Sequence, residues 1–400
     1  MTYWTAVKSE VGALQGNNRG KILLVIAGGW FVSIGARATF PVILPHLRVE
    51  YGLGYGTSGL LLSVMFLAYG VGALPGGILS DRIGEGRILT VSMAVSAVTV
   101  VLVITAGSTV ILFTATLLFG FATGMYGVAR YTALKDLYPE RIGSAIGVVN
   151  ASSDMGQSIL PPLAGIIAAA ISWQLGFGLI IPLFIFITVW LFYMVPSRTS
   201  EPTSAVDTIG LESLRYVLTQ LWRPRLIRGT LLLTLAMAIW QAFTGFFPTY
   251  LIEIKGMSSS TAGTLFGLFF VLGIAIKPLS GVSYDRFGVR RSMYVLAVVC
   301  LLGLVFLPLA DGLLQLIVVT VLVSPMLGFS TVLITYVTVE LSQDMQGTGL
   351  GILRMVYWSV SAMSPLAFGL VADQGFFNEA FLGLAVLVLL MIAFTVLLSE

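Results

Sequence analysis

Long apolar runs separated by short polar breaks fill almost the whole chain. Because roughly 20 apolar residues cross a bilayer as a helix, this pattern predicts an all-α integral membrane protein with twelve transmembrane helices. The predicted helices are residues 22–45, 56–80, 88–106, 110–131, 143–170, 175–195, 227–251, 260–283, 292–309, 313–338, 347–371 and 378–398. The one long polar break, residues 196–226, predicts a cytoplasmic linker between an N-terminal half, 1–195, and a C-terminal half, 227–400.

A short polar motif occurs twice between apolar runs. Residues 77–87 and 281–291 both read G-x-x-x-D-R-x-G-x-x-R, and equivalent residues are 204 positions apart. The same offset relates Pro161 to Pro365, well outside the motif. A register that is kept over such a distance indicates an internal repeat of the whole fold. We therefore predict two pseudo-symmetric halves of six helices each.

The composition agrees with a membrane protein and argues against an enzyme. Hydrophobic residues make up 57% of the chain and charged residues 10%, whereas soluble domains carry about 25% charged residues. His46 is the only histidine and Cys300 the only cysteine, and we find no nucleophile–base set and no phosphate-binding loop. We expect no cofactor, no metal and no nucleic-acid partner.

Basic residues are distributed unevenly between the predicted loops. If the N-terminus is cytoplasmic, almost all loop Lys and Arg residues lie on the cytoplasmic side, and only Arg48 and Lys255 lie outside. Such a bias sets the orientation of helical membrane proteins. We predict a multi-pass protein of the cytoplasmic membrane with both termini, and both copies of the motif, in the cytoplasm.

The doubled motif, the twelve predicted helices and the central linker together resemble the major facilitator superfamily of secondary transporters. The resemblance implies two halves that rock about a central site to give alternating access. It also implies a cytoplasmic gate, in which Asp81 faces the start of the eleventh helix and Arg87 pairs with Asp136. Together with the equivalent residues of the repeat, the implied gate residues are Asp81, Arg82, Arg87, Asp136, Asp285, Arg286, Arg291 and Glu340. The alternative is that these residues only tie short loops together.

Five charged residues lie well inside the predicted helices, away from their ends: Arg37, Arg130, Asp154, Lys277 and Arg354. A charge near the centre of a bilayer costs roughly 3 kcal/mol or more, and it usually faces a cavity or a partner. Four bases and one acid, if all are ionised, make the membrane interior of the protein positive. Such an interior would attract an anion.

Polar residues share one face of the predicted helix 143–170. Asn150, Asp154 and Gln157 recur at helical spacing, and the repeat relates this face to Arg354 and Trp358 in the predicted helix 347–371. We predict that these two helices form opposite walls of a central cavity.

Basic residues of other helices complete the predicted site. At 1.5 Å per residue, Lys277 lies about 12 Å and Arg354 about 10 Å from the cytoplasmic ends of their helices, so the two would face each other and clamp a carboxylate. Arg37 and its repeat partner Gln241 would line the cavity from the remaining helices. The predicted substrate-binding residues are Arg37, Asn150, Gln157, Gln241, Lys277, Arg354 and Trp358.

The same charges also have structural interpretations. Lys277 and Arg354 could instead form a network with Asp154, and Arg37 and Arg130 could extend to the membrane interface. Asp154 itself is either a fixed counter-ion or a group that takes up and releases a proton during the cycle.

Two branches of the superfamily resemble this site. A cation in the eighth helix with another in the eleventh is similar to the oxalate/formate antiporters and monocarboxylate transporters, where such a pair holds the substrate carboxylates. The acidic signature that is common in the first helix of the monocarboxylate group is absent. Arg37 in the first helix instead resembles organophosphate and sugar-acid carriers. Both resemblances imply an anionic substrate.

We therefore predict a secondary active transporter that moves a small organic anion, with a carboxylate as the first choice, as an antiporter or a proton symporter. One alternative is a proton-coupled exporter of amphipathic drugs, although a cavity for cationic drugs would be expected to carry net acid. Another class is a non-transporting membrane sensor or partner-binding subunit. The expected partners are the anionic substrate, the lipid bilayer and, in a symporter, protons, and we expect a monomer.

Overall fold

The computed structural model describes residues 19–199, 223–341 and 346–396. Within these ranges all regular structure is helical and no strand occurs, which confirms the predicted all-α class. Most of the predicted linker, residues 200–222, lies outside the described ranges. The division into 1–195, 196–226 and 227–400 therefore stays a prediction.

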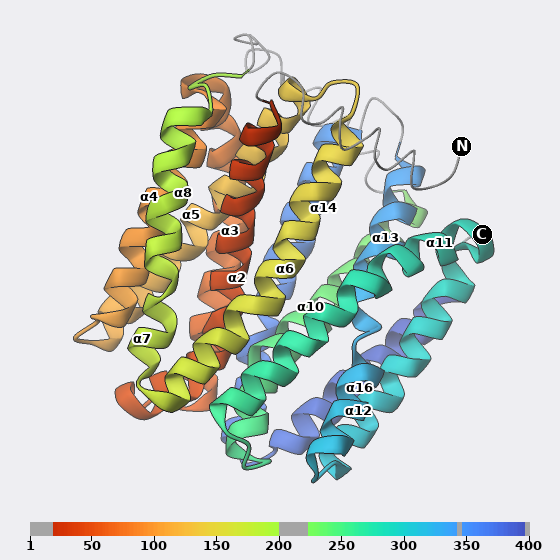
Figure 1. The fold of residues 1–400 in the computed structure, drawn as a ribbon. Helices are drawn as coiled ribbons and strands as arrows, with labels where there is room; N and C mark the ends of the chain where they lie inside the picture. The colour runs from red at the N-terminus through yellow and green to blue at the C-terminus, as the bar shows by residue number, and fades with distance from the viewer. Residues whose placement is uncertain (1–18, 200–222, 342–345, 397–400) are drawn as a thin grey trace.

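The helices form two groups along the chain. The first group comprises α2 (Arg19–Tyr51), α3 (Tyr55–Ile83), α4 (Glu85–Ile104), α5 (Thr109–Leu137), α6 (Ile142–Ala170), α7 (Trp173–Gly178) and α8 (Ile180–Met194). The second group comprises α10 (Pro224–Glu253), α11 (Ser259–Phe306), the short 3-10 turn η3 (Leu307–Leu309), α12 (Leu313–Val323), α13 (Met326–Glu340), α14 (Gln346–Ser361), α15 (Ser364–Asp373) and α16 (Phe377–Thr395). Figure 1 shows the groups spreading apart toward the end where α2 begins. We call that end, where α8 ends and α10 begins, the linker end, and the opposite end the far end.

Ten helical stretches in the described ranges are long and apolar enough to cross a membrane. One of them, Ser259–Leu309, is 51 residues long and contains Gly288, whose φ of 76° and ψ of 175° interrupt α11. Helix α6 has 29 residues but is not among the ten, because its polar residues lower its hydropathy. A multi-pass membrane protein is therefore supported, and the number of twelve helices stays a prediction.

Glycines let α3 and α5 pack backbone to backbone. A Cβ atom at Gly124 of α5 would lie 2.2 Å from the Tyr69 carbonyl oxygen of α3, so no larger residue fits this contact without a shift. Close approach of this kind is the usual role of glycine between membrane helices. The contact brings Tyr69 and, two turns further along α5, Arg130 to the centre of the molecule.

The two groups of helices meet at the far end. Helices α3 and α15 are so close that a Cβ atom at Gly59 would lie 2.2 Å from the Pro365 carbonyl oxygen. His46 of α2 and Ser259 of α11 form a hydrogen bond of 3.1 Å. These contacts close the far end in this conformation, while the groups diverge toward the linker end (Figure 1).

Candidate functional site

A cavity of about 300 Å³ lies between the two groups of helices. Helices α2, α3, α5 and α6 form its wall on one side, and α10, α11, α13 and α14 form the wall on the other. The predicted site residues that line it are Arg37, Asn150, Asp154, Gln157, Lys277, Arg354 and Trp358. Sequence positions far apart in the chain are thus gathered at one place.

Tyr69 connects two arginines that come from opposite walls. The Cζ atom of Arg37 lies 4.2 Å from the centre of the Tyr69 ring. A nitrogen of Arg354 donates a hydrogen bond of 3.4 Å to the Tyr69 hydroxyl. A guanidinium that stacks on an aromatic face keeps its N–H groups at the edge, where they remain able to bind a carboxylate in bidentate fashion.

Arg130 also lines the cavity and lies between two rings. Its Cζ atom is 3.7 Å from the centre of the Trp30 ring and 4.0 Å from the centre of the Tyr131 ring. The residue is 1% exposed. The sequence left open whether Arg130 reaches the interface instead, and the structure places it in the cavity wall.

Several buried guanidinium nitrogens lack a hydrogen-bond partner. They are Nη1 of Arg37 and both Nε and Nη1 of Arg130. Among the residues that the structure describes, no carboxylate forms an ion pair with either arginine or with Arg354. A buried cation without a partner is costly. All three guanidinium groups line the cavity, and those of Arg37 and Arg130 are buried there without a carboxylate partner from the described chain.

Lys277 and Asp154 form an ion pair that joins the two groups of helices. The Lys277 Nζ atom lies 2.5 Å from a carboxylate oxygen of Asp154, and the side chains are 33% and 13% exposed. Lys277 thus pairs with Asp154, as the network interpretation has it, whereas Arg354 contacts Tyr69 and forms no ion pair with Asp154. Asp154 is the only acid among the described residues that line the cavity, so the cavity carries a net positive charge when all groups are ionised.

Comparison with known proteins identifies the family. The profile of the Major Facilitator Superfamily matches residues 26–365 and, in a second alignment, residues 256–400. The chain belongs to this superfamily. It is a membrane transporter fold and not an enzyme, as predicted.

Individual members of the superfamily are similar over most of the chain. A hexuronate transporter of Bacillus subtilis (strain 168) is 26% identical over 371 residues, which are 88% of each chain. A probable nitrate/nitrite antiporter, NarK1, of Thermus thermophilus is 24% identical over 290 residues, 69% of this chain and 64% of that one. The crystal structure of a bacterial homologue of the human lysosomal transporter Spinster, inward-facing and unoccupied, superimposes with a TM-score of 0.80 at 14% identity, covering 96% and 97% of the two chains.

The residues of the superfamily's implied gate lie at the linker end, where the groups are apart. Glu340 pairs with Arg225 at 3.5 Å, and Asp136 accepts a hydrogen bond of 3.2 Å from Thr199. Among the described residues no ion pair joins Arg87 to Asp136 or Arg291 to Glu340. The other implied gate side chains, Asp81, Arg82, Asp285 and Arg286, are exposed. The two implied ion pairs are thus absent from the described residues in this conformation, and the role of the gate stays a prediction.

Gln241 is the one predicted substrate-binding residue that does not line the cavity. Trp240 occupies the cavity face of α10, and the next residue of a helix points about 100° away. Gln241 is fully buried and donates a hydrogen bond of 2.8 Å to the Ser361 hydroxyl. The repeat relates Gln241 to Arg37 by position in the sequence, but it does not determine how α10 is rotated about its own axis.

Replacing Gln241 with Leu should leave anion binding unchanged, because the side chain lies outside the cavity. The loss of the hydrogen bond to Ser361 should lower the free energy of unfolding by no more than about 1 kcal/mol. The Gln241 Oε1 atom has no hydrogen-bond partner in the described chain, so the substitution removes no second bond. The matched variant Gln157→Leu, inside the cavity, should weaken binding about tenfold. Equal losses of affinity in the two variants, measured by ligand titration, would contradict this placement.

Tyr69 and Tyr131 were not identified from the sequence. Both lie in apolar helices, where an aromatic residue is usually packing, as for Tyr126, whose hydroxyl donates to the Ile26 carbonyl at 2.8 Å. The only available signal was the position of Tyr131 directly after Arg130.

Proposed function

We propose that this superfamily member is a secondary active transporter that moves a small organic anion, most simply a carboxylate, by alternating access. The observation that carries the proposal is a group of three arginines that line the cavity without a carboxylate partner in the described chain: Arg37 and Arg130, which are buried, and Arg354, which is partly buried. The names of the hexuronate and nitrate/nitrite carriers among its relatives agree with an anionic substrate. A net positive cavity disfavours the cationic amphipathic drugs of the alternative function.

In the proposed complex, Arg37 and Arg354 bind the substrate carboxylate from opposite walls and share Tyr69 as a support. Charge-assisted, bidentate hydrogen bonds are the strongest that a planar carboxylate can receive. The amides of Asn150 and Gln157 would bind polar groups of the substrate body, and Trp358 would contact its apolar face. A substrate held from both groups of helices would favour the state in which both walls close on it.

The proposal includes the membrane arrangement. We infer twelve transmembrane helices, counting α6 and the two parts of α11, in two six-helix halves with both termini in the cytoplasm. The linker end is then cytoplasmic, and the structure corresponds to a cavity open inward. The implied gate would close that end in the opposite state. Asp154 would act as the counter-ion of Lys277 in an antiporter, or would carry a proton in a symporter.

A screen of thermal stability with small anions tests the proposed substrate class. A ligand that binds only the folded state stabilises it by about 2.7 kcal/mol at a hundredfold excess over Kd. We expect uronates or other small carboxylates to raise the melting temperature of the purified protein, and neutral sugars of the same size to leave it unchanged. Stabilisation by nitrate alone would restrict the proposal to inorganic anions, and stabilisation by lipophilic amines alone would overturn it.

A further inference from the structure

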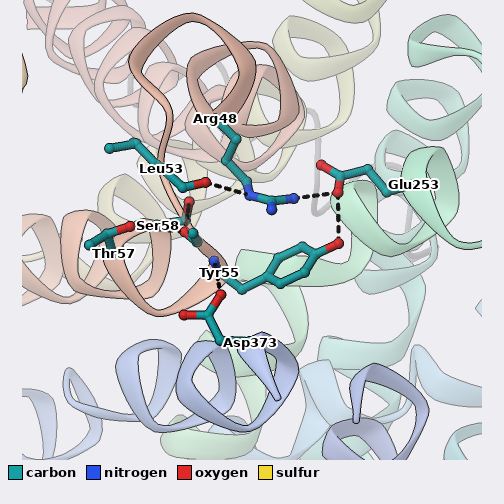
Figure 2. Close-up of polar contacts among 8 residues, drawn as sticks. Arg48, Leu53, Tyr55, Thr57, Ser58, Glu253 and Asp373 are labelled. Atoms are coloured by element: carbon teal, nitrogen blue, oxygen red, sulfur yellow. Dashed lines mark hydrogen bonds and ion pairs between the residues drawn. The ribbon is translucent and has the colours of Figure 1, made fainter. Parts of the chain in front are cut away.

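Tyr55, the first residue of α3, is held by three helices of the second group. Its hydroxyl donates a hydrogen bond of 2.8 Å to Glu253 of α10, and its ring packs edge-on against Phe377 of α16 with ring centres 4.9 Å apart. Its backbone N–H donates to Asp373 of α15 at 2.5 Å. Figure 2 shows Tyr55 between the two carboxylates, with Arg48 stacked on its ring and paired with Glu253.

Asp373 supplies the cap that the start of α3 lacks. The N-cap residue of this helix is Gly54, which has no side chain to satisfy the first free N–H groups. The Asp373 carboxylate accepts from the N–H of Tyr55 and, at 2.7 Å, from that of Gly56. A Cβ atom at Gly54 or Gly56 would lie 2.9 Å or 2.7 Å from a carboxylate oxygen, so these glycines leave the space that the carboxylate fills.

Asp373 is poorly placed within its own helix. It is the last residue of α15, and a negative charge at the C-terminus of a helix is disfavoured by the helix dipole. The positive end of α3 provides the compensation. This compensation exists only while α3 and α15 are in contact, which makes it specific to the conformation with the far end closed.

We propose that Asp373 and Glu253 form a clasp on Tyr55 that holds the far end closed, and that its release opens the far end. The proposal deepens the transport function, because it assigns the far-end gate of the same alternating-access cycle. The clasp lies outside the cavity, so its residues set the balance between the two states without contacting the substrate.

The repeat provides an internal comparison for the clasp. Ser258 is 204 positions after Gly54 and caps α11, the repeat-related helix. Its own hydroxyl accepts a hydrogen bond of 3.1 Å from the N–H of Thr261, so this cap does not depend on the other group of helices. Removing the Ser258 cap should therefore weaken a helix start without favouring either state.

Distance measurements between spin labels at Val110→Cys and Leu314→Cys test the proposal. Both positions are exposed, at the far-end starts of α5 and α12, and Cys300 is fully buried and does not compete for the label. In lipid nanodiscs without substrate, Asp373→Asn should raise the ratio of far-end-open to far-end-closed protein about tenfold, because charge-assisted bonds are lost. Tyr55→Phe, which removes only the hydroxyl, should raise the ratio about threefold, and Ser258→Gly should leave it unchanged.

An unchanged distance distribution in both Asp373→Asn and Tyr55→Phe would overturn the clasp. An equal shift in Ser258→Gly would overturn it as well, since the effect would then come from the helix start alone. The measurement needs no ligand, so failure of the anion screen leaves it valid. Conversely, Asp373→Asn should keep the anion-induced stabilisation, because Asp373 does not line the cavity.

Discussion

Replacing Arg354 with Gln is expected to weaken binding of the substrate anion about 100-fold, which corresponds to ~2.7 kcal/mol. Arg354 is one of the three arginines that line the cavity, none of which forms an ion pair with a described carboxylate, and it approaches Tyr69 from the second group of helices. Its loss removes a bidentate donor and one of the contacts between the two walls, the hydrogen bond to Tyr69. Isothermal titration with the anion found in the stability screen measures the change.

The matched control for this variant is Arg19→Gln. It makes the same change in charge and size at an exposed position at the linker end, at the start of α2. We expect its affinity to stay within about twofold of the original protein, because a screened surface charge contributes little. A similar loss in both variants would mean that overall charge, not the arginine group, attracts the anion.

The second large effect is expected from the Lys277–Asp154 pair. Lys277→Met leaves a mostly buried carboxylate without its cation, and we expect the free energy of unfolding to fall by about 2–3 kcal/mol. Adding Asp154→Asn should recover most of this loss, because neither charge then remains in the cavity. A double-mutant cycle in denaturant, followed by circular dichroism, gives the coupling energy directly.

The exposed pair Arg225–Glu340 offers the control cycle. Its side chains are 59% and 22% exposed and its charges lie 3.5 Å apart, so its coupling energy should be below about 1 kcal/mol. If the Lys277–Asp154 cycle gives no larger value than this one, the pair does not join the two groups of helices as the structure indicates.

The charged residues of the cavity were predictable because the membrane penalises them. Arg37, Asp154, Lys277 and Arg354 stand out in apolar runs, and a charge there needs a cavity or a partner. Depth along each helix follows from counting residues. The rotation of each helix about its axis does not follow from such counting. The contacts of Gln241 with Ser361 and of Lys277 with Asp154 depend on this rotation, so the sequence alone could not decide them.

The tyrosines and the far-end clasp could not be predicted from local patterns. Tyr69 matters only because α3 brings its ring to Arg37 and Arg354. Tyr55 and Asp373 are 318 positions apart in the sequence, and no local pattern in the sequence connects them. Their importance arises from the contact between α3 and α15, which only the packed structure reveals.

Counterflow in proteoliposomes tests the central claim most directly, because exchange of a labelled anion for the same unlabelled anion needs no coupling ion. We predict that liposomes loaded with the stabilising carboxylate accumulate the labelled carboxylate through the original protein and not through Arg354→Gln. If the original protein exchanges no anion but does exchange a neutral or cationic compound, the arginine group is not a substrate site and the proposed function is wrong.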